Sequence, residues 1–398
     1  MLLYDEAKWR NDRKANGNRP YQQCSISVMD TISDPNISFD EKGICNYYYD
    51  YLQREKEQVF FGKEAEEKLS AIVEKIKEFG KGHKYDCITG VSGGVDSTYL
   101  CLTAKRLGLN PLIVHFDNGW NSELAVKNIE NIISRLGFDL YTFVVDWNEF
   151  KDLQLAYLKA SVVDIEALTD HAIIGTLYRL AAEYDIKYVL SGYNIVTEGV
   201  LPSYWVWSKT DHANIKDIHK KFGTIPLKTF PLFTARQKRF DMLRKGIEVI
   251  NLLNYVPYNK KKVKEDIAQE LGWRDYGGKH YESVFTRFYQ GYILPAKFGI
   301  DKRKAHLSNL IFSRQITKEE ALVELAKPIY DHDQLKEDYE FVLKKFNLSA
   351  QEFEAIMKAP RKEHTDYAVE KGVFEQYPFL EVLKPVGRAI QQMIVKKF

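Results

Sequence analysis

A chain of 398 residues, 45% hydrophobic and 28% charged, has the composition of a globular protein and enough length for two or three domains. Its net charge of +2 gives no electrostatic case for nucleic acid or a membrane surface as partner, and no uncharged apolar run approaches the roughly 18 residues of a membrane span. Met1 to Glu6 lack the basic and apolar regions of a secretory signal, and four cysteines are too few for a disulfide framework. We therefore expect a cytoplasmic protein.

The pattern along the chain predicts three parts: a polar N-terminal lobe over 1–60, an α/β domain over 61–235, and a mainly helical C-terminal region for substrate or partner over 236–398. The predicted elements, in chain order, are a helix over 63–79, a strand over 85–91, a helix over 97–107, a strand over 111–116, a helix over 122–136, a strand over 140–145, a helix over 170–184 and a strand over 187–190. Strands that alternate with helices predict an α/β fold with a doubly wound parallel sheet.

Two later signals extend this pattern. Residues 224–233 are interpreted as one more edge strand, and Ser349 with Glu352 resembles a capping box that opens a late helix. In a doubly wound sheet, ligands bind at the carboxyl ends of the strands. Residues 90–97, 117–119 and 191–198 all lie at such ends.

The strongest motif is Ser92-Gly93-Gly94-Val95-Asp96-Ser97, between the first predicted strand and its helix; we call it the phosphate loop. Glycines let the backbone approach an anion, and the start of a helix offers unpaired N–H groups. The Ser92 and Ser97 hydroxyls add donors. Asp96 does not suit a phosphate cradle unless a metal mediates, so we assign it to Mg²⁺ and count it among the catalytic residues. A Gly-Lys-Ser/Thr is absent, so this is not a Walker loop.

The loop resembles the pyrophosphate loop of the ATP-pyrophosphatase (PP-loop) superfamily, whose members cleave ATP between the α and β phosphates. The resemblance implies an adenine nucleotide alpha hydrolase-like (HUP-type) fold, with ATP and Mg²⁺ as cofactors. It also implies nucleotide contacts from two further segments. These are His115, Phe116 and Asp117 after the second strand, and Gly192 and Asn194 after the fourth.

Two residues of the second nucleotide segment carry open questions. Tyr193 stands where the superfamily commonly has His. Glu198 is either a Mg²⁺ ligand or a plain helix-start carboxylate.

Four stretches resemble the N-acetyl sugar amidotransferase family of lipopolysaccharide and flagellar sugar biosynthesis. They are CSISVMDTISDPNISFDEKGIC (24–45), TDHAI (169–173), YGGKHYES (276–283) and FGIDKRKAHLSNL (298–310). The resemblance implies that ATP adenylylates the oxygen of a sugar N-acetyl group and that ammonia then displaces AMP to leave an acetamidino group. It also implies a nucleotide-linked N-acetylated sugar as substrate and a separate glutaminase subunit as partner, in keeping with the absence of a glutaminase motif in this chain.

The family's N-terminal segment carries two Cys-x-x-Cys pairs that form a zinc site. In this chain Cys24 is followed by Ser27, and Cys45 by Tyr48. Ser and Tyr are poor zinc ligands, so we expect no zinc.

A basic group within the shared stretches predicts an anion site for ATP phosphates or an acidic sugar, although a solvated surface explains it too. Its members are Lys279, His280, Lys302 and Arg303, and we add Lys279 and His280 to the catalytic candidates.

A second candidate group lies at the start of the helix over 170–184. His171 is a candidate general base, and the carboxylates of Asp164, Glu166 and Asp170 are candidates to position ammonia or a metal. Helix capping by Asp170 is the alternative.

Two other functions stay open at this stage. One is a tRNA-modifying PP-loop enzyme, a lysidine synthetase or thiolase, although the net charge of +2 fits tRNA poorly and Cys87 and Cys101 lie within a predicted strand and helix. The other is a non-catalytic nucleotide-binding module, which shares the sheet but lacks the full phosphate loop.

Overall fold

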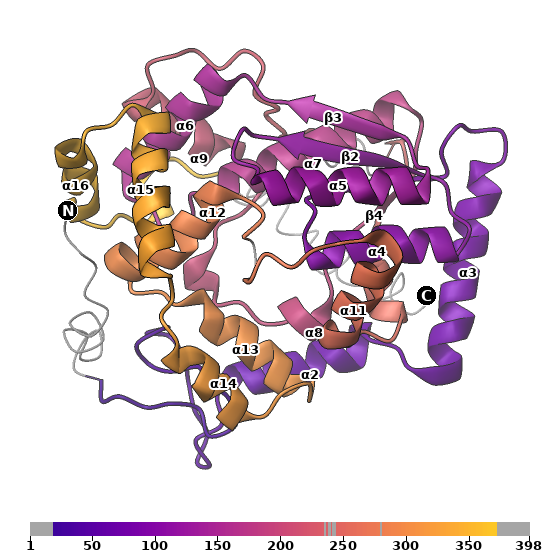
Figure 1. Cartoon of the computed structure of the whole chain (residues 1–398), viewed down its shortest axis with the longest axis horizontal. Helices are drawn as coiled ribbons and strands as arrows, with labels where there is room; N and C mark the ends of the chain where they lie inside the picture. The colour runs from indigo at the N-terminus through magenta and orange to yellow at the C-terminus, as the bar shows by residue number, and fades with distance from the viewer. Residues whose placement is uncertain (1–18, 235, 238–239, 241–243, 279–280, 372–398) are drawn as a thin grey trace, which may run out of the picture.

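The computed structural model describes residues 19–234, 236–237, 240, 244–278 and 281–371 (Figure 1). Its centre is a five-stranded parallel sheet in the order β3-β2-β1-β4-β5. The strands are β1 (Cys87–Gly90), β2 (Pro111–Asp117), β3 (Leu140–Val144), β4 (Tyr188–Leu190) and β5 (Glu248–Ile250). The predicted fold class is confirmed: this is an α/β protein with the strand order of the HUP type.

Helices cover both faces of the sheet. On one face lie α4 (Val95–Arg106), α5 (Glu123–Leu136) and α11 (Lys260–Leu271), and α7 (Ala167–Glu183) packs against β1 and β4 on the other. Because the central strands are covered on both faces, β1, β2 and β4 are almost wholly buried, whereas the edge strand β3 alternates in exposure. This burial explains why the sequence pattern identified the central strands as apolar runs.

One prediction about the sheet needs correction. Residues 224–233 form no strand; they are a loop whose backbone N–H groups donate to carboxylates of α6 (Trp147–Ala160), a helix that the sequence analysis missed. Asp152 accepts from the backbone N–H groups of Thr224 and Ile225, and Glu149 accepts from those of residues 228–230. With its N–H groups bound to side chains, this segment has no donors left for a sheet ladder. The fifth strand is instead 248–250.

Most of the remaining helices come after the sheet in the chain. In Figure 1 the arrowheads of β2 and β3, which mark the carboxyl edge of the sheet, point toward α12 and α15. The remaining helices are α3 (Gly62–Gly80), α8 (Ile195–Glu198), α9 (His212–Phe222), α12 (Val284–Phe288), the π-helix η3 (Tyr289–Phe298), α13 (Lys302–Phe312), α14 (Lys318–Ala326), α15 (His332–Phe346) and α16 (Ala350–Lys358), with short 3₁₀ turns η1 (Ser203–Trp205), η2 (Leu252–Tyr255) and η4 (His364–Asp366). The capping box at Ser349 and Glu352 is present and confirms the late helix α16.

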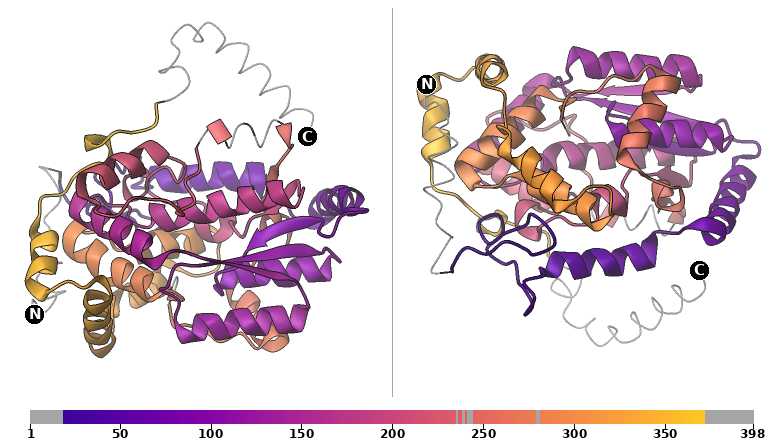
Figure 2. Two further views of the ribbon diagram at one scale, coloured as in Figure 1. Left: turned by 90° about the horizontal axis from the view of Figure 1, so that it is seen from above. Right: turned by 60° about the horizontal axis from the view of Figure 1, so that its bottom comes forward.

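The N-terminal lobe is held against the C-terminal helices rather than against the sheet. Its helix α2 (Asn46–Gln58) packs on α8 and α13, as the right view of Figure 2 shows for α13. Lys304 pairs with the buried Asp30, and Lys318 donates to the carbonyl of Cys24. The division at residues 60 and 235 stays a prediction, and β5 lies beyond the second of these boundaries.

Within the described ranges, no helix is both long and apolar enough to cross a membrane.

Candidate functional site

The phosphate loop connects β1 to α4 at the carboxyl edge of the sheet. Gly93 adopts a φ of +82°, and a Cβ there would lie 2.8 Å from the Tyr276 hydroxyl. The Gly93 carbonyl accepts from Trp273 Nε1 and from Tyr276 Oη, both at 2.8 Å. Only glycine fits this conformation and this space, and two side chains from beyond α11 fix the loop's path.

Two serine hydroxyl groups lie close together in the phosphate loop. Ser97 Oγ accepts from the Ser92 backbone N–H at 3.3 Å, and the two hydroxyl oxygens are 3.3 Å apart. Ser92 is exposed, and the loop opens the first turn of α4. Hydroxyls beside a helix N-terminus form a cradle suited to phosphate oxygens.

Asp96 lies in the phosphate loop, and two neighbouring side chains hold its carboxylate in place. Its Oδ1 accepts from Asn194 Nδ2 at 3.3 Å and from the Tyr258 hydroxyl. Burial raises the pKa of Tyr258, and the charges of Asp96 and, to a smaller extent, Glu198 raise it further. Both carboxylates therefore lie within electrostatic range of the Tyr258 hydroxyl. The structure thus brings Asp96 and Asn194 into contact, with Glu198 within electrostatic range of the same hydroxyl, and the assignment of this group to nucleotide and Mg²⁺ stays a prediction. No group of three or more His, Cys, Asp or Glu arranged for a metal occurs among the described residues.

The predicted adenine segment is ordered by its own side chains. His115 Nδ1 lies 3.1 Å from the Val91 carbonyl and Nε2 lies 3.0 Å from Asn121 Nδ2, which fits a neutral ring that donates from Nδ1. Asp117 accepts from the Gly119 N–H at 2.9 Å and from Asn121, and Phe116 stacks on Phe143. These side chains face protein partners, so their backbone is the part available to a base.

Gly192 and Asn194 face the loop from the end of β4. A Cβ on Gly192 would lie 3.5 Å from the backbone nitrogen of Ser97. Asn194 caps α8 by accepting from the Thr197 N–H, while its amide reaches Asp96. Tyr193, half-buried, lies beside Arg54, which donates to the Gly199 carbonyl.

A carboxylate that the sequence analysis did not assign stands at the loop. Glu282 Oε1 is 3.5 Å from Ser92 Oγ, and the same oxygen would lie 3.1 Å from a Cβ at Gly94. The backbone of Glu282 accepts from the Ser122 N–H. An acidic side chain at this point lies where a phosphate oxygen would also lie.

The predicted anion group separates in the structure. Arg303 is bound to Asp301 and donates to the Lys327 carbonyl at 2.9 Å, so it ties α13 to the end of α14. Lys302 lies instead within electrostatic range of Asp164, Glu166, Asp170 and Lys209. Lys279 and His280 lie outside the described residues.

The geometry of His171 favours a structural role over that of a general base. Its Nδ1 lies 2.9 Å from the Lys209 carbonyl, and its Nε2 accepts from the Phe233 N–H at 2.9 Å. Burial, despite the Lys209 carbonyl, lowers the pKa of His171 to about 4. Asp170 is half-exposed and pairs with Lys209 at 3.1 Å.

Cys24 and Cys45 meet in the N-terminal lobe, and both are fully buried. The Cys45 N–H donates to Cys24 Sγ, and Ser27 Oγ is 3.9 Å from Cys45 Sγ. The hydrogen bond with Cys24, together with burial, raises the pKa of the Cys45 thiol. Tyr48 packs on Phe312. The absence of zinc stays a prediction.

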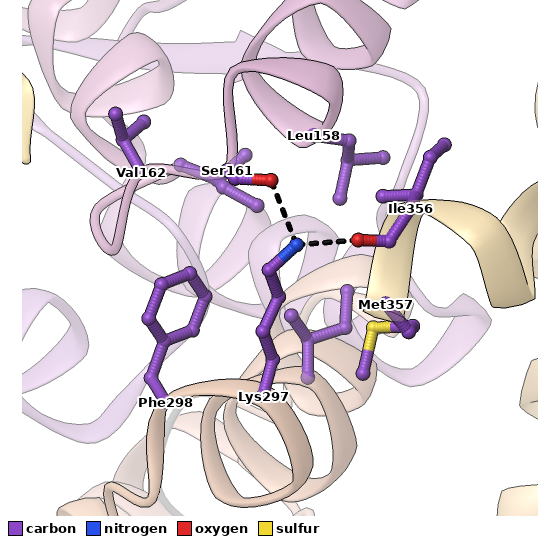
Figure 3. Close-up of a pocket in the computed structure, with 9 residues that line it drawn as sticks. Leu158, Ser161, Val162, Lys297, Phe298, Ile356 and Met357 are labelled. Carbon is purple, nitrogen blue, oxygen red and sulfur yellow. Dashed lines mark hydrogen bonds between the residues drawn. The ribbon is translucent and has the colours of Figure 1, made fainter. Parts of the chain in front are cut away.

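A separate apolar pocket lies between α6, η3 and α16 (Figure 3). Lys297 points into it and is held by Ser161 Oγ at 2.8 Å and by the Ile356 carbonyl. Burial lowers the pKa of Lys297 to about 8. Its other walls are apolar, and its one amine is already bonded, so we interpret it as packing between helices.

Sequence analysis missed the residues that hold the loop from a distance: Trp273, Tyr276, Tyr258 and Glu282. Tyr276 and Glu282 lie inside the YGGKHYES stretch, which was noted for its resemblance only. Trp273 and Tyr258 carried no local signal.

The comparisons with known proteins agree with this geometry in one region. Residues 282–383 match the family described as "LPS biosynthesis protein WbpG-like, C-terminal domain". The matched residues include Glu282, which lies 3.5 Å from Ser92 Oγ, and the helices α12 and α13. No curated protein matches the chain.

Solved structures give only distant likenesses. NH3-dependent NAD synthetase from Campylobacter jejuni is 12% identical at a TM-score of 0.31, covering 75% of this chain and 98% of its own. NMN synthetase from Francisella tularensis is 13% identical at 0.32, covering 73% and 98%. A predicted subunit of tRNA methyltransferase from Methanocaldococcus jannaschii is 19% identical at 0.26, covering 46% and 75%. At TM-scores this low we draw nothing about function from them.

Proposed function

We propose that this protein is an ATP-dependent amidotransferase that converts a sugar N-acetyl group into an acetamidino group in bacterial surface polysaccharide or flagellin sugar biosynthesis. The observation that carries the proposal is the phosphate loop at the end of β1, facing a WbpG-like region. The HUP-type strand order supports ATP as the nucleotide.

The residues at the loop fit the triphosphate of ATP. Ser92, Ser97 and the first N–H groups of α4 would bind the β and γ phosphates, and the glycines leave room for them. Asp96 and Glu198 are the carboxylates that would hold Mg²⁺, which supplies positive charge to the leaving pyrophosphate.

The reaction balances in two steps. The amide oxygen attacks the α-phosphorus, the bond to the β-phosphate oxygen breaks, and pyrophosphate leaves. Ammonia then adds to the imidate carbon, the bond from that carbon to the AMP oxygen breaks, and a proton is released. Adenylylation is needed because an amide oxygen is a very poor leaving group, whereas AMP is a good one.

Ammonia comes from a glutaminase partner in this proposal, because the sequence has no glutaminase motif. The purified protein should therefore use ammonium salts and fail with glutamine alone. Its activity at fixed total ammonium should rise with pH, because neutral ammonia is the nucleophile.

The decisive experiment supplies ATP, Mg²⁺, ammonium and a nucleotide-linked N-acetyl sugar. We expect AMP and pyrophosphate in equal amounts and a sugar in which nitrogen has replaced one amide oxygen, seen by mass spectrometry. Accumulation of ADP would contradict the proposal. Sugar-independent exchange that transfer RNA stimulates would favour a tRNA-modifying enzyme instead.

A further inference from the structure

A group of charged side chains meets at the N-terminus of α7, on the same edge of the sheet as the phosphate loop. Glu166 precedes α7, Lys302 opens α13, and Thr286 lies in α12. Asp164 and Lys209 complete the group, which we call the acceptor cluster, together with Asp170. A helix that precedes a strand of a parallel sheet begins at the carboxyl edge, so both sites share that edge.

Part of the acceptor cluster is satisfied by its own members. Lys209 Nζ lies 2.6 Å from Asp164 Oδ2 and 3.1 Å from Asp170 Oδ2. Asp164 also accepts from the Trp207 N–H at 2.7 Å. These three charges form a closed set that needs no ligand.

Two groups of the acceptor cluster are not satisfied. Glu166 Oε2 accepts from Thr286 Oγ1 at 2.8 Å, but Oε1 is buried without a hydrogen-bond partner, and so is Thr169 Oγ1. Lys302 makes no hydrogen bond or ion pair within the described part of the chain, although Glu166 and Asp164 lie within its electrostatic range. An unsatisfied buried polar group costs about 1–3 kcal/mol. A ligand that donates to Glu166 and offers an anion to Lys302 would remove both deficits.

A short stretch of chain joins the acceptor cluster to the phosphate loop. Glu282 contacts Ser92 Oγ at 3.5 Å, and Ser283 caps α12 by accepting from the Thr286 N–H at 3.2 Å. Four residues of chain span at most about 14 Å, so Thr286 lies within that distance of Glu282. A molecule bound at Glu166 can therefore reach toward the α-phosphate of a nucleotide in the loop.

We propose that Glu166, Thr286 and Lys302 bind the acceptor, an N-acetylated sugar that carries an anionic oxygen group such as a carboxylate. Glu166 Oε1 accepts from a hydroxyl or amide N–H of that sugar, and Lys302 pairs with its anion. This proposal rests on the proposed function and names its substrate class.

The protonation of the acceptor cluster is consistent with this assignment. Burial raises the pKa of Glu166 to about 7, Thr286 opposes the shift, and Asp170, Lys302 and Asp164 act on it as well. Burial also lowers the pKa of Lys302, while Asp164 raises it and Lys209 lowers it. A bound anion would raise the pKa of Lys302, and a bound donor would lower the pKa of Glu166.

The test compares UDP-N-acetylglucosaminuronic acid with UDP-N-acetylglucosamine, in sugar-dependent ATP–pyrophosphate exchange and in direct calorimetric binding. We expect Glu166→Gln and Lys302→Met to raise the sugar KM about 10- to 100-fold while the KM for ATP stays within about twofold. Lys302→Met should also lose the preference for the acidic sugar. The exposed residues Lys336 and Glu340 supply matched controls, Lys336→Met and Glu340→Gln, that should leave both constants unchanged.

The outcomes separate this site from the proposed function. If the wild type catalyses sugar-dependent ATP–pyrophosphate exchange and the folded variants keep the same sugar KM, the proposed acceptor site is wrong while the proposed function stands. A water would then fill the site. If the wild type binds a sugar nucleotide but catalyses no ATP–pyrophosphate exchange, the proposed function is wrong. Loss of that sugar binding in the variants would still support the acceptor site. Wild type that binds neither sugar would contradict both. If Lys302→Met fails to fold, Thr286→Val, which removes the hydrogen bond to Glu166 Oε2, is judged by the same two constants.

Discussion

The phosphate loop and the acceptor cluster lie at the same edge of one sheet but are built in opposite ways. The loop is six consecutive residues whose carbonyl and hydroxyl groups already have protein partners. The cluster draws on four segments separated by up to 138 positions, from Asp164 to Lys302, and it leaves Glu166 Oε1 unsatisfied. Under the proposed function, a preformed local motif would bind the nucleotide, whereas selectivity for the sugar would come from a site that its ligand completes.

The largest expected effect on turnover comes from a substitution in the phosphate loop. Asp96→Asn keeps the shape of the side chain and its bond from Tyr258 but removes the charge assigned to Mg²⁺. We expect turnover to fall about 10²- to 10³-fold with an unchanged melting temperature. Production of AMP measures it, and Asp333→Asn on the surface is the control. Near-normal turnover at saturating Mg²⁺ would rule out the assignment.

The second prediction concerns pH and the packing around the start of α7. Burial lowers the pKa of His171 and of His364 from 6.5 to about 4. Because these folded pKa values are depressed, the stability they contribute is present above pH 6.5 and is lost as pH falls toward 4. Each should remove about 2 kcal/mol of unfolding free energy between pH 7.5 and pH 5.

Urea unfolding at those two pH values checks this expectation. His171→Gln should lower stability at pH 7.5 and weaken the pH dependence, while the folded fraction keeps its kcat. A variant that stays stable but loses the acidic limb of its pH–rate profile would show instead that His171 is the general base first predicted.

The third prediction tests how far the loop depends on its distant supports. Trp273→Phe and Tyr276→Phe each remove one donor to the Gly93 carbonyl. At about 1 kcal/mol for a hydrogen bond, each should raise the KM for ATP about fivefold and leave the sugar KM unchanged. Tyr281→Phe, which loses a bond to the Ile329 carbonyl away from the loop, is the control. Equal changes in both constants would mean that the loop and the acceptor cluster move together.

The smallest expected effect lies at the junction of the two sites. Glu282 places a negative charge 3.5 Å from Ser92 Oγ, so it should repel a phosphate there in the absence of metal. Glu282→Gln should tighten pyrophosphate binding about fivefold without Mg²⁺, since charges at this spacing in water interact by about 1 kcal/mol. Calorimetry measures it against the exposed Glu319→Gln. Weaker binding would show that Glu282 acts as a donor when protonated.

Much of the fold could be predicted because its signals are local. The strands over 87–90 and 111–117 are apolar runs followed by turn residues, and the helices after them begin and end at capping residues such as Ser122 and Gly137. The edge of the sheet was harder. The loop over 224–233 has strand-like composition, and only the carboxylates of Glu149 and Asp152 show that its N–H groups are already bound.

The sequence by itself determined the phosphate loop, since phosphate binding needs glycines and hydroxyls on adjacent residues at a helix start, and adjacency is what a sequence records. It also nominated Asp170, His171, Lys302 and Arg303, but it could not say which way they face. Tertiary structure decided that. Both ring nitrogens of His171 are hydrogen-bonded to the backbone of Lys209 and Phe233, and Arg303 is paired with Asp301. Lys302 lies within electrostatic range of Glu166, at a place where residues of α12 and α13 approach the start of α7 from distant parts of the chain. Burial and pairing depend on that convergence, and no local pattern encodes it.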